Sequence, residues 1–295
     1  MKTISLHNHS LSLPTSWEEL SFNDKCQAFD LMERAISGNL ASNPVYALVL
    51  FLCHLTGYKP SRSFNSDRDT INFNLLRIAE QLTVPFSIVN GVITPNLDFH
   101  TNPFPFIKIK GKRYIGVQFN LDVTARTNFT ARQFTDAFDL LSAVRNLPLI
   151  EQKNVCINQL ISILYPAHPD YHTNATSDHI NRVNSLPSSI KYGIVSWFAS
   201  IVKFYTTHPD YSPLFRGHLN HEEDPPSRNG MNEVSLFLRS EGYGDPYTMN
   251  LTDYFDAQIK SLRDSISRSI SSGVKPDELS AKTGIPMSVI LSLSN

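Results

Sequence analysis

The chain has 295 residues, of which 41% are hydrophobic and 18% are charged, so it has enough apolar side chains to bury a core in one or two domains. With 26 Lys and Arg residues against 27 Asp and Glu residues, the formal net charge is −1. This balance excludes a global field that would attract nucleic acid or an anionic membrane, so any such role needs a local patch. Because the charged fraction is below the globular average of about 25%, we expect partners or self-association.

Compartment and redox state follow from the absence of long apolar segments and from the cysteine spacing. The N-terminus lacks the apolar run of a signal peptide. The longest apolar segment, Val45–Leu55, is shorter than the roughly 18 residues that cross a bilayer. We therefore expect a cytosolic protein without membrane association. The cysteines are widely separated, which favours buried free thiols over disulfides; they are Cys26, Cys53 and Cys156.

The first third of the chain predicts a hairpin followed by helices. Apolar and polar residues alternate in Thr3–Leu13, as in a short hairpin. Ser16 and Glu19 have the spacing of a capping box, and a second helix start follows at Ser21, with Gly38 as its stop. Two further helices are predicted, Val45–Thr56 and Ile71–Leu82.

Two β-hairpins are predicted next. Asn90-Gly91 is a strong hairpin turn signal between apolar strands. A second hairpin has Gly111-Lys112 between its strands, Phe106–Lys110 and Arg113–Ile115. We expect the two hairpins to join in one small antiparallel sheet, which makes the fold class mainly α with a small antiparallel β insert (α+β).

The rest of the chain predicts helices separated by polar segments. Thr130 and Gln133 form a second capping box that opens a helix, and Pro148 ends that helix. The polar segment His168–Pro187 predicts a mobile loop, and His218–Pro226 predicts an exposed linker. The remaining predicted helices are Asn154–Leu164, Ile190–Tyr205, Met231–Ser240 and Met249–Ile270. We divide the chain into a helical domain with the β insert (1–166), a flexible loop (167–187), a second helical domain (188–270) and a C-terminal helical hairpin (271–295).

The C-terminal hairpin has the spacing of a helix-turn-helix. Apolar, small and glycine residues fall where that motif places its contacts and its turn; they are Leu279, Ser280, Gly284, Ile285, Ile290 and Leu293. The second helix, however, contains no Arg, Lys or Gln that could contact phosphates or base edges. The pattern favours a hairpin that packs against protein, and DNA binding is the alternative.

A basic cluster lies on the second hairpin, at Lys108, Lys110, Lys112 and Arg113. Lys108 and Lys110 share one face of a strand, which predicts the solvated side of an amphipathic hairpin. A phosphate-binding surface would need an aromatic side chain on the same face. The nearest candidate, Tyr114, satisfies this only in one register, so we do not expect nucleic acid among the partners.

Metal and catalytic motifs are weak in this sequence. His168 is followed by Pro169, which argues against a helix that would bring it beside His172. A second group of potential ligands is also followed by prolines and predicts loop composition rather than a zinc site; it comprises His218, His221, Glu222, Glu223 and Asp224. No Gly-rich phosphate loop, Gly-x-Ser-x-Gly elbow or His-Glu-x-x-His motif occurs. We therefore expect no catalytic residue, metal, cofactor or small-molecule substrate.

Leu13–Leu20 contains the motif Pro-x-x-Trp-x-Glu-Leu, and Phe106–Gly116 is predicted to form the central basic hairpin. Both segments, and their order, resemble those of uncharacterised proteins encoded in the tail regions of bacteriophages and prophages. Val117 stands where that family typically has proline. Further short similarities lie at Asn128–Phe134, Leu160–Pro166, Ser196–Phe198, Tyr211–Phe215 and Ser240–Gly244.

The resemblance implies a non-enzymatic phage tail protein, either a virion component or an assembly chaperone for the tape-measure protein. Its partners would be other tail proteins or further copies of itself. It would reside in the cytoplasm of the bacterial host during assembly, or in the virion. Two competing hypotheses are a transcriptional regulator that binds DNA through its C-terminus and a metal-dependent hydrolase.

Overall fold

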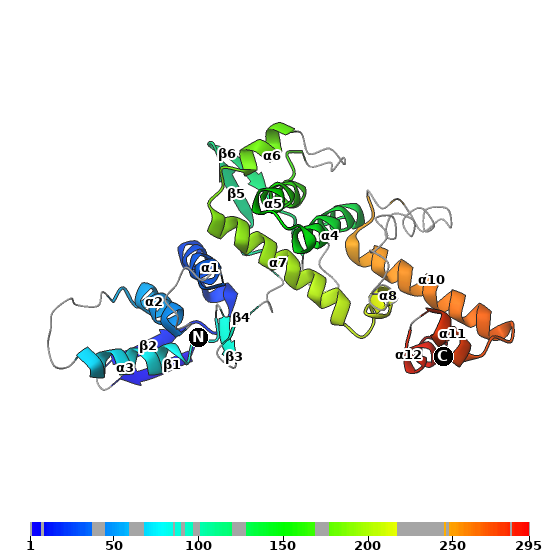
Figure 1. Cartoon of the computed structure of the whole chain (residues 1–295), viewed down its shortest axis with the longest axis horizontal. Helices are drawn as coiled ribbons and strands as arrows, with labels where there is room; N and C mark the ends of the chain where they lie inside the picture. The colour runs from blue at the N-terminus through cyan, green and yellow to red at the C-terminus, as the bar shows by residue number, and fades with distance from the viewer. Residues whose placement is uncertain are drawn as a thin grey trace. The chain divides into compact units, whose positions relative to one another are not determined.

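The computed structural model of the chain is mainly helical with short antiparallel hairpins, which confirms the expected fold class (Figure 1). It describes residues 2–6, 9–36, 45–58, 68–84, 86–89, 92–96, 101–119, 128–168, 177–216, 245, 248–283 and 285–294. Several predicted features lie outside these residues: the Gly38 stop, the Asn90-Gly91 turn, the His218–Pro226 linker, the Met231–Ser240 helix and the Gly284 turn.

The described chain forms two compact units, each assembled from separate stretches of sequence. The first contains Met1–Gly116 and Asp178–Ser200, and the second contains Val117–Ser177 and Ile201–Asn295. This division differs from the consecutive domains that the sequence suggests.

The elements that precede residue 117 in the chain are β1 (Lys2–Leu6), β2 (His9–Leu13), the 3₁₀ helix η1 (Trp17–Glu19), α1 (Phe22–Ile36), α2 (Val45–Thr56), α3 (Arg68–Ala79), β3 (Phe86–Val89), β4 (Val92–Pro95), β5 (Phe106–Ile109) and β6 (Lys112–Ile115). The later elements are α4 (Ala131–Asn146), α5 (Ile150–Leu164), α6 (Ser177–Val183), α7 (Ser188–Thr207), α8 (Pro213–Arg216), α10 (Leu251–Ser271), α11 (Pro276–Thr283) and α12 (Met287–Ser294).

The N-terminal hairpin is confirmed, but the capping box predicted at Ser16 is wrong. Strands β1 and β2 pair antiparallel, with Lys2 opposite Leu13. Ser16 makes no capping hydrogen bond, and only the short η1 follows it. The Glu19 carboxylate instead accepts hydrogen bonds from the backbone N–H of Thr15, at 2.7 Å, and from the Thr15 hydroxyl, at 3.2 Å. The carboxylate therefore reaches one residue further back than a capping box requires.

The reciprocal cap occurs one turn later, at the start of α1. The backbone N–H of Asp24 donates to Ser21 Oγ at 3.2 Å, and the backbone N–H of Ser21 donates to Asp24 Oδ2 at 3.1 Å. A Ser-x-x-Asp pair thus performs the role that Ser-x-x-Glu plays in the usual capping box. This contact fixes the start of α1 at the position that the sequence predicts.

The core of the first unit is built around Phe29 of α1. Its ring stacks on Trp17 at a centroid distance of 4.7 Å and lies 5.7 Å from Phe104. The Tyr192 ring of α7 is 6.4 Å away. Phe29 and Phe104 are both fully buried, so this cluster joins η1, α1, the segment before β5 and the first turns of α7.

The hairpins form three separate two-stranded sheets among the described residues, so the prediction of one joint sheet is wrong. Strand β3 pairs with β4, and β5 pairs with β6. The turn of the last hairpin is Lys110-Gly111, one residue earlier than predicted, with positive φ angles of 48° and 80°. Two successive left-handed residues are typical of the two-residue turns that match strand twist.

In the second unit, α4 and α5 form a helical hairpin. The predicted capping box is confirmed, because Thr130 Oγ1 accepts from the Gln133 backbone N–H and the Gln133 side chain accepts from the Thr130 backbone N–H. Helix α5 begins at Ile150, four residues before the predicted start. The polar residues Glu151, Gln152 and Lys153 are good helix formers, so they extend the helix toward Pro148. Gln133 also donates to the Ile163 carbonyl at 3.4 Å, which ties the two helices together.

Helix α6 occupies part of the segment predicted to be a loop. His179 and Val183 of α6 are buried, and so is Leu186 just after the helix. These side chains hold α6 against its unit, whereas the predicted loop rested on the polar majority of the segment. The remainder of the segment, residues 169–176, lies outside the described residues.

An aromatic cluster fills the core of the second unit. Phe255 of α10 lies at its centre, with ring centroids 4.2 Å from Tyr205, 5.4 Å from Phe134 and 5.7 Å from Phe215. The N-terminal ends of α4 and α10 also meet, because Thr130 and Asn250 form an antiparallel bridge. These contacts join helices that are far apart in the sequence.

Candidate functional site

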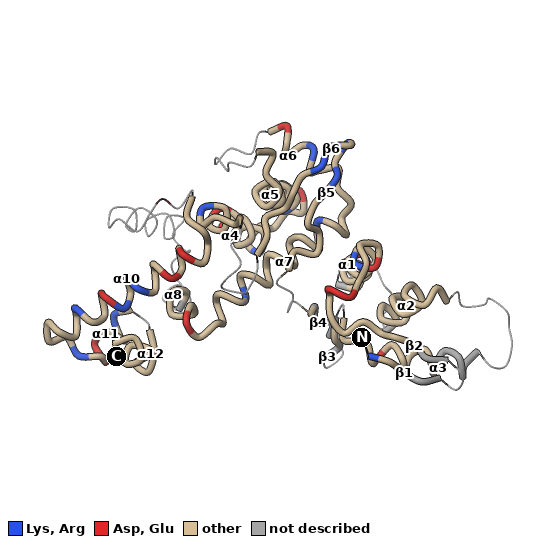
Figure 2. Tube along the Cα trace, turned by 180° about the vertical axis from the view of Figure 1, so that it is seen from behind, with Lys and Arg blue, Asp and Glu red and all other residues tan. Residues whose placement is uncertain are grey.

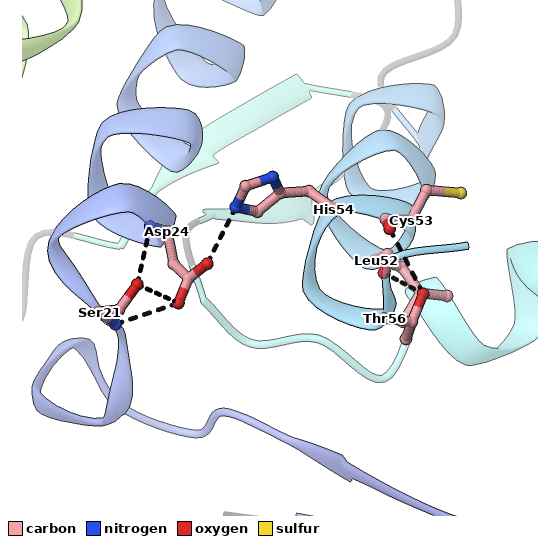
Figure 3. A network of polar contacts seen from close by, with 6 residues as sticks. All are labelled: Ser21, Asp24, Leu52, Cys53, His54 and Thr56. Carbon is pink, nitrogen blue, oxygen red and sulfur yellow. Dashed lines mark hydrogen bonds and ion pairs between the residues drawn. The ribbon is translucent and has the colours of Figure 1, made fainter. Parts of the chain in front are cut away.

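Among the described residues, Ser21, Asp24 and His54 form the polar cluster that most resembles a catalytic constellation (Figure 3). Ser21 Oγ donates to Asp24 Oδ2 at 2.6 Å, and His54 Nε2 lies 2.9 Å from Asp24 Oδ1. Ser21 and Asp24 come from the start of α1, and His54 comes from the last turn of α2. The cluster therefore joins the two helices.

The order of these groups does not suit nucleophilic catalysis. In a catalytic triad the imidazole lies between the serine and the carboxylate and accepts the serine proton. Here the carboxylate lies in the middle, and the serine hydroxyl donates to it while accepting a helix N–H. Ser21 and Asp24 cap α1, and His54 anchors α2 to that cap.

The Asp24 contacts predict acid-sensitive packing of α1. Partial burial raises the pKa of Asp24, but the hydrogen bonds from Ser21 and the contact with His54 outweigh burial and lower the pKa below its ordinary value. A lowered folded-state pKa contributes stability above the unfolded pKa of about 4, and this stability is lost as the pH falls through the folded value. We expect Asp24→Asn to cost about 1–2 kcal/mol at pH 7 and to flatten the acid limb of the stability curve.

Urea denaturation at pH 7 and pH 3 measures this effect. Asp30→Asn is the matched control, because Asp30 forms only an exposed ion pair with Arg34 at 3.4 Å, and such pairs contribute little. An Asp24→Asn protein that loses as much stability on acidification as the unmodified protein would contradict the assignment.

Thiol chemistry and metal binding find no support among the described residues. Cys26, Cys53 and Cys156 are free, as predicted, but only Cys53 is buried and the other two are partly exposed. Burial raises the pKa of Cys26 and of Cys53, which keeps these two thiols protonated. No group of three potential metal ligands occurs in the described part of the chain. Of the histidines considered in the sequence, His168 is exposed. His172 and the group at His218, His221, Glu222, Glu223 and Asp224 lie outside the described residues.

Within the described ranges, no helix combines the length and the apolarity that a bilayer crossing needs.

The C-terminal helix-turn-helix-like pair packs as the sequence predicts. Four side chains share a buried core: Ile266 of α10, Leu279 of α11, Ile285 just before α12, and Ile290 of α12. The Ser280 hydroxyl donates to the Ile285 carbonyl at 2.8 Å, and the Thr283 hydroxyl donates to the Leu279 carbonyl at 2.7 Å. The small polar residues thus fix the ends of the turn, and the end of α10 supplies the third helix of the module.

The outward face of α12 is apolar and uncharged. Met287 and Leu291, one helical turn apart, are 49% and 42% exposed. Ser288 and Ser292 are exposed beside them. In a DNA-binding module this helix would carry the base-reading side chains. The i, i+4 spacing of Met287 and Leu291 could have indicated this face in the sequence. It was missed because the helix-turn-helix pattern assigns apolar residues to the interior.

The four cations predicted as a cluster are all exposed on the β5–β6 hairpin. Figure 2 shows Lys and Arg concentrated along these two strands. Tyr114 does not share the face of Lys108 and Arg113, because it pairs with Ile107 and is buried. It lies instead beside Lys112, whose ammonium group is 5.3 Å from the centroid of the Tyr114 ring. Phe106, which was predicted in the strand but not on this face, pairs with Ile115 and shares the face of Lys108 and Arg113.

Comparisons of the chain with protein-family models, with curated protein sequences and with solved structures gave no match.

Proposed function

We propose that this protein is a non-enzymatic component of a bacteriophage or prophage tail system that acts through protein–protein contacts. The role would be that of a virion component or of an assembly chaperone for the tape-measure protein. The observation that carries the protein-contact part is the exposed Met287–Leu291 face of α12. A helix-turn-helix-like module that presents methionine and leucine where DNA-binding modules present polar and cationic groups is suited to an apolar partner surface.

Further exposed apolar side chains support the same proposal. At the start of α5, Leu149, Ile150 and Val155 are 54%, 72% and 52% exposed. Each of them is removed from water when a partner covers it, which is favourable by about 25 cal/mol per Å² of apolar area. The phage-tail part of the proposal is supported by the resemblance of the sequence signals, from Leu13–Leu20 onward.

Co-expression of the full chain with the proteins encoded beside it in its genome tests this function. We expect a complex in size-exclusion chromatography, or a self-associated form, that Leu291→Asp weakens at least tenfold because a charge would be buried in the interface. Ser267→Asp, an exposed position on α10, is the control for the added charge. Absence of any complex with these neighbours, together with a monomeric chain, would refute the proposal.

A DNA-binding regulator is the second candidate, because α11 and α12 pack as a helix-turn-helix does. The cations closest to such a role, Arg268, Lys275 and Lys282, are exposed on the module. Sequence-selective gel shifts at low salt that the triple alanine variant abolishes would favour this function over the tail role.

A further inference from the structure

The β5–β6 hairpin presents one face to its unit and leaves the other free. Ile107, Ile109 and Tyr114 are buried on the inner face. The Tyr114 ring packs against the His179 ring of α6 at a centroid distance of 4.7 Å. At the open end of the hairpin, the Gly116 N–H donates to the Pro105 carbonyl at 3.1 Å. The hairpin is therefore anchored along its inner face, and its outer face is held in a fixed geometry.

The outer face places aromatic, aliphatic and cationic side chains together. The strand register sets Phe106 opposite Ile115 and Lys108 opposite Arg113, and side chains two apart on a strand share a face. The Arg113 guanidinium lies over the Phe106 ring, 4.0 Å from its centroid. Ile115 is 59% exposed. An apolar pair thus lies directly beside a cation pair.

No carboxylate among the described residues compensates the charge of this hairpin. Lys110 and Lys112 are exposed at its turn, and residues 101–119 contain no Asp or Glu. Within the described part of the chain, no ion pair joins Lys108, Lys110, Lys112 or Arg113 to a carboxylate. Four cations within six residues, on a protein whose net charge is −1, form the kind of local patch that an anionic partner requires.

We propose that the outer face of the β5–β6 hairpin, made of Phe106, Lys108, Arg113 and Ile115, binds single-stranded nucleic acid. Such strands are held by cations along the phosphate backbone and by flat or apolar side chains against unstacked bases. Arginine guanidinium planes also stack on exposed bases. An acidic peptide would use the cations but would leave the Phe106–Arg113 stack and Ile115 without a role. This inference does not depend on the proposed tail function.

Fluorescence anisotropy of the full chain with a labelled oligothymidine, at low salt, tests the proposal. We expect the double variant Lys108→Ala with Arg113→Ala to raise the dissociation constant at least tenfold. The slope of log affinity against log salt should fall by about 1.4, because each phosphate of a single strand that a cation neutralises contributes about 0.7 to this slope. Circular dichroism and thermal melting verify that the exposed substitutions leave the fold unchanged.

Two further variants separate stacking from charge and locate the site. Arg113→Lys keeps the charge but removes the planar group, and we expect it to weaken binding at least about fivefold. Lys275→Ala with Lys282→Ala removes the same charge from the C-terminal module and should leave the affinity unchanged. If this control abolishes binding instead, the site lies in the C-terminal module and the proposal is wrong.

Competing polyanions complete the test. We expect weaker binding to a duplex of the same length, whose bases are stacked, and to polyglutamate and phosphatidylserine vesicles. Equal or tighter binding to polyglutamate or to the vesicles would overturn the assignment, as would an Arg113→Lys protein with unchanged affinity. No measurable binding to the oligothymidine would also overturn it.

Discussion

Phe255→Ala is expected to lower the free energy of unfolding of the second unit by about 3–5 kcal/mol. Phe255 is fully buried, and its ring neighbours include Tyr205 at 4.2 Å, Phe134 at 5.4 Å and Phe215 at 5.7 Å. Truncation removes apolar burial, opens a cavity between helices that aromatic rings cannot easily fill, and deletes ring pairs worth about 0.5–1.5 kcal/mol each.

Hydrogen exchange localises this loss better than tryptophan fluorescence does. Both tryptophans, Trp17 and Trp197, belong to the first unit, whereas amide exchange is measured residue by residue within the second unit. We expect reduced amide protection in α4 and α10. Phe73→Ala, at an α3 position that is 59% exposed, is the matched control and should change stability by less than about 0.5 kcal/mol. Similar losses in both variants would show that the aromatic cluster is not the core of its unit.

Helix identity was predictable from this sequence because the helices carry their own local signals. The Thr130–Gln133 capping box and the apolar periodicity of α1 and α10 act within one segment. A boundary such as the start of α5 was missed because polar residues that follow a proline suit a helix as well as a loop. The strand register that buries Tyr114 depends on which two residues form the turn. The turn position was missed because lysine rarely adopts the left-handed backbone conformation that Lys110 has here.

Long-range pairing could not be predicted in the same way. The association of residues 178–200 with the N-terminal stretch depends on which apolar faces are complementary, and periodicity describes each face alone. The candidate sites show the same limit. The four hairpin cations were evident in the sequence, but the stack of Arg113 on Phe106 follows from the cross-strand register.

The exposed side chains that support protein contact also escaped prediction for a physical reason. A helix-turn-helix spacing assigns Ile290 and Leu293 to the interior, and it leaves the remaining apolar residues of α12 without an assignment. Met287 and Leu291 lie on the opposite face, where the three-helix core does not reach them. An apolar helix can therefore satisfy one predicted core and still present a second apolar face to a partner.

Gly193→Ala should destabilise the first unit by about 1–3 kcal/mol, although alanine is the better helix former by about 1 kcal/mol. A Cβ atom at position 193 of α7 would lie 2.6 Å from ring atoms of both Phe29 and Phe104. Both rings are fully buried, so neither can move aside without disturbing the cluster that also holds Trp17. The close approach of the two rings therefore explains why a glycine occupies position 193 inside a helix.

Urea denaturation followed by tryptophan emission measures this effect, since Trp17 stacks on Phe29. The double variant Gly193→Ala with Phe104→Leu supplies the control, because the smaller and more flexible leucine makes room for the added methyl group. We expect the double variant to lose less stability than the sum of its two single variants, with a coupling of about 0.5–3 kcal/mol. A Gly193→Ala protein that is more stable than the unmodified chain would mean that helix propensity decides the outcome and that α7 does not approach Phe29 and Phe104 this closely.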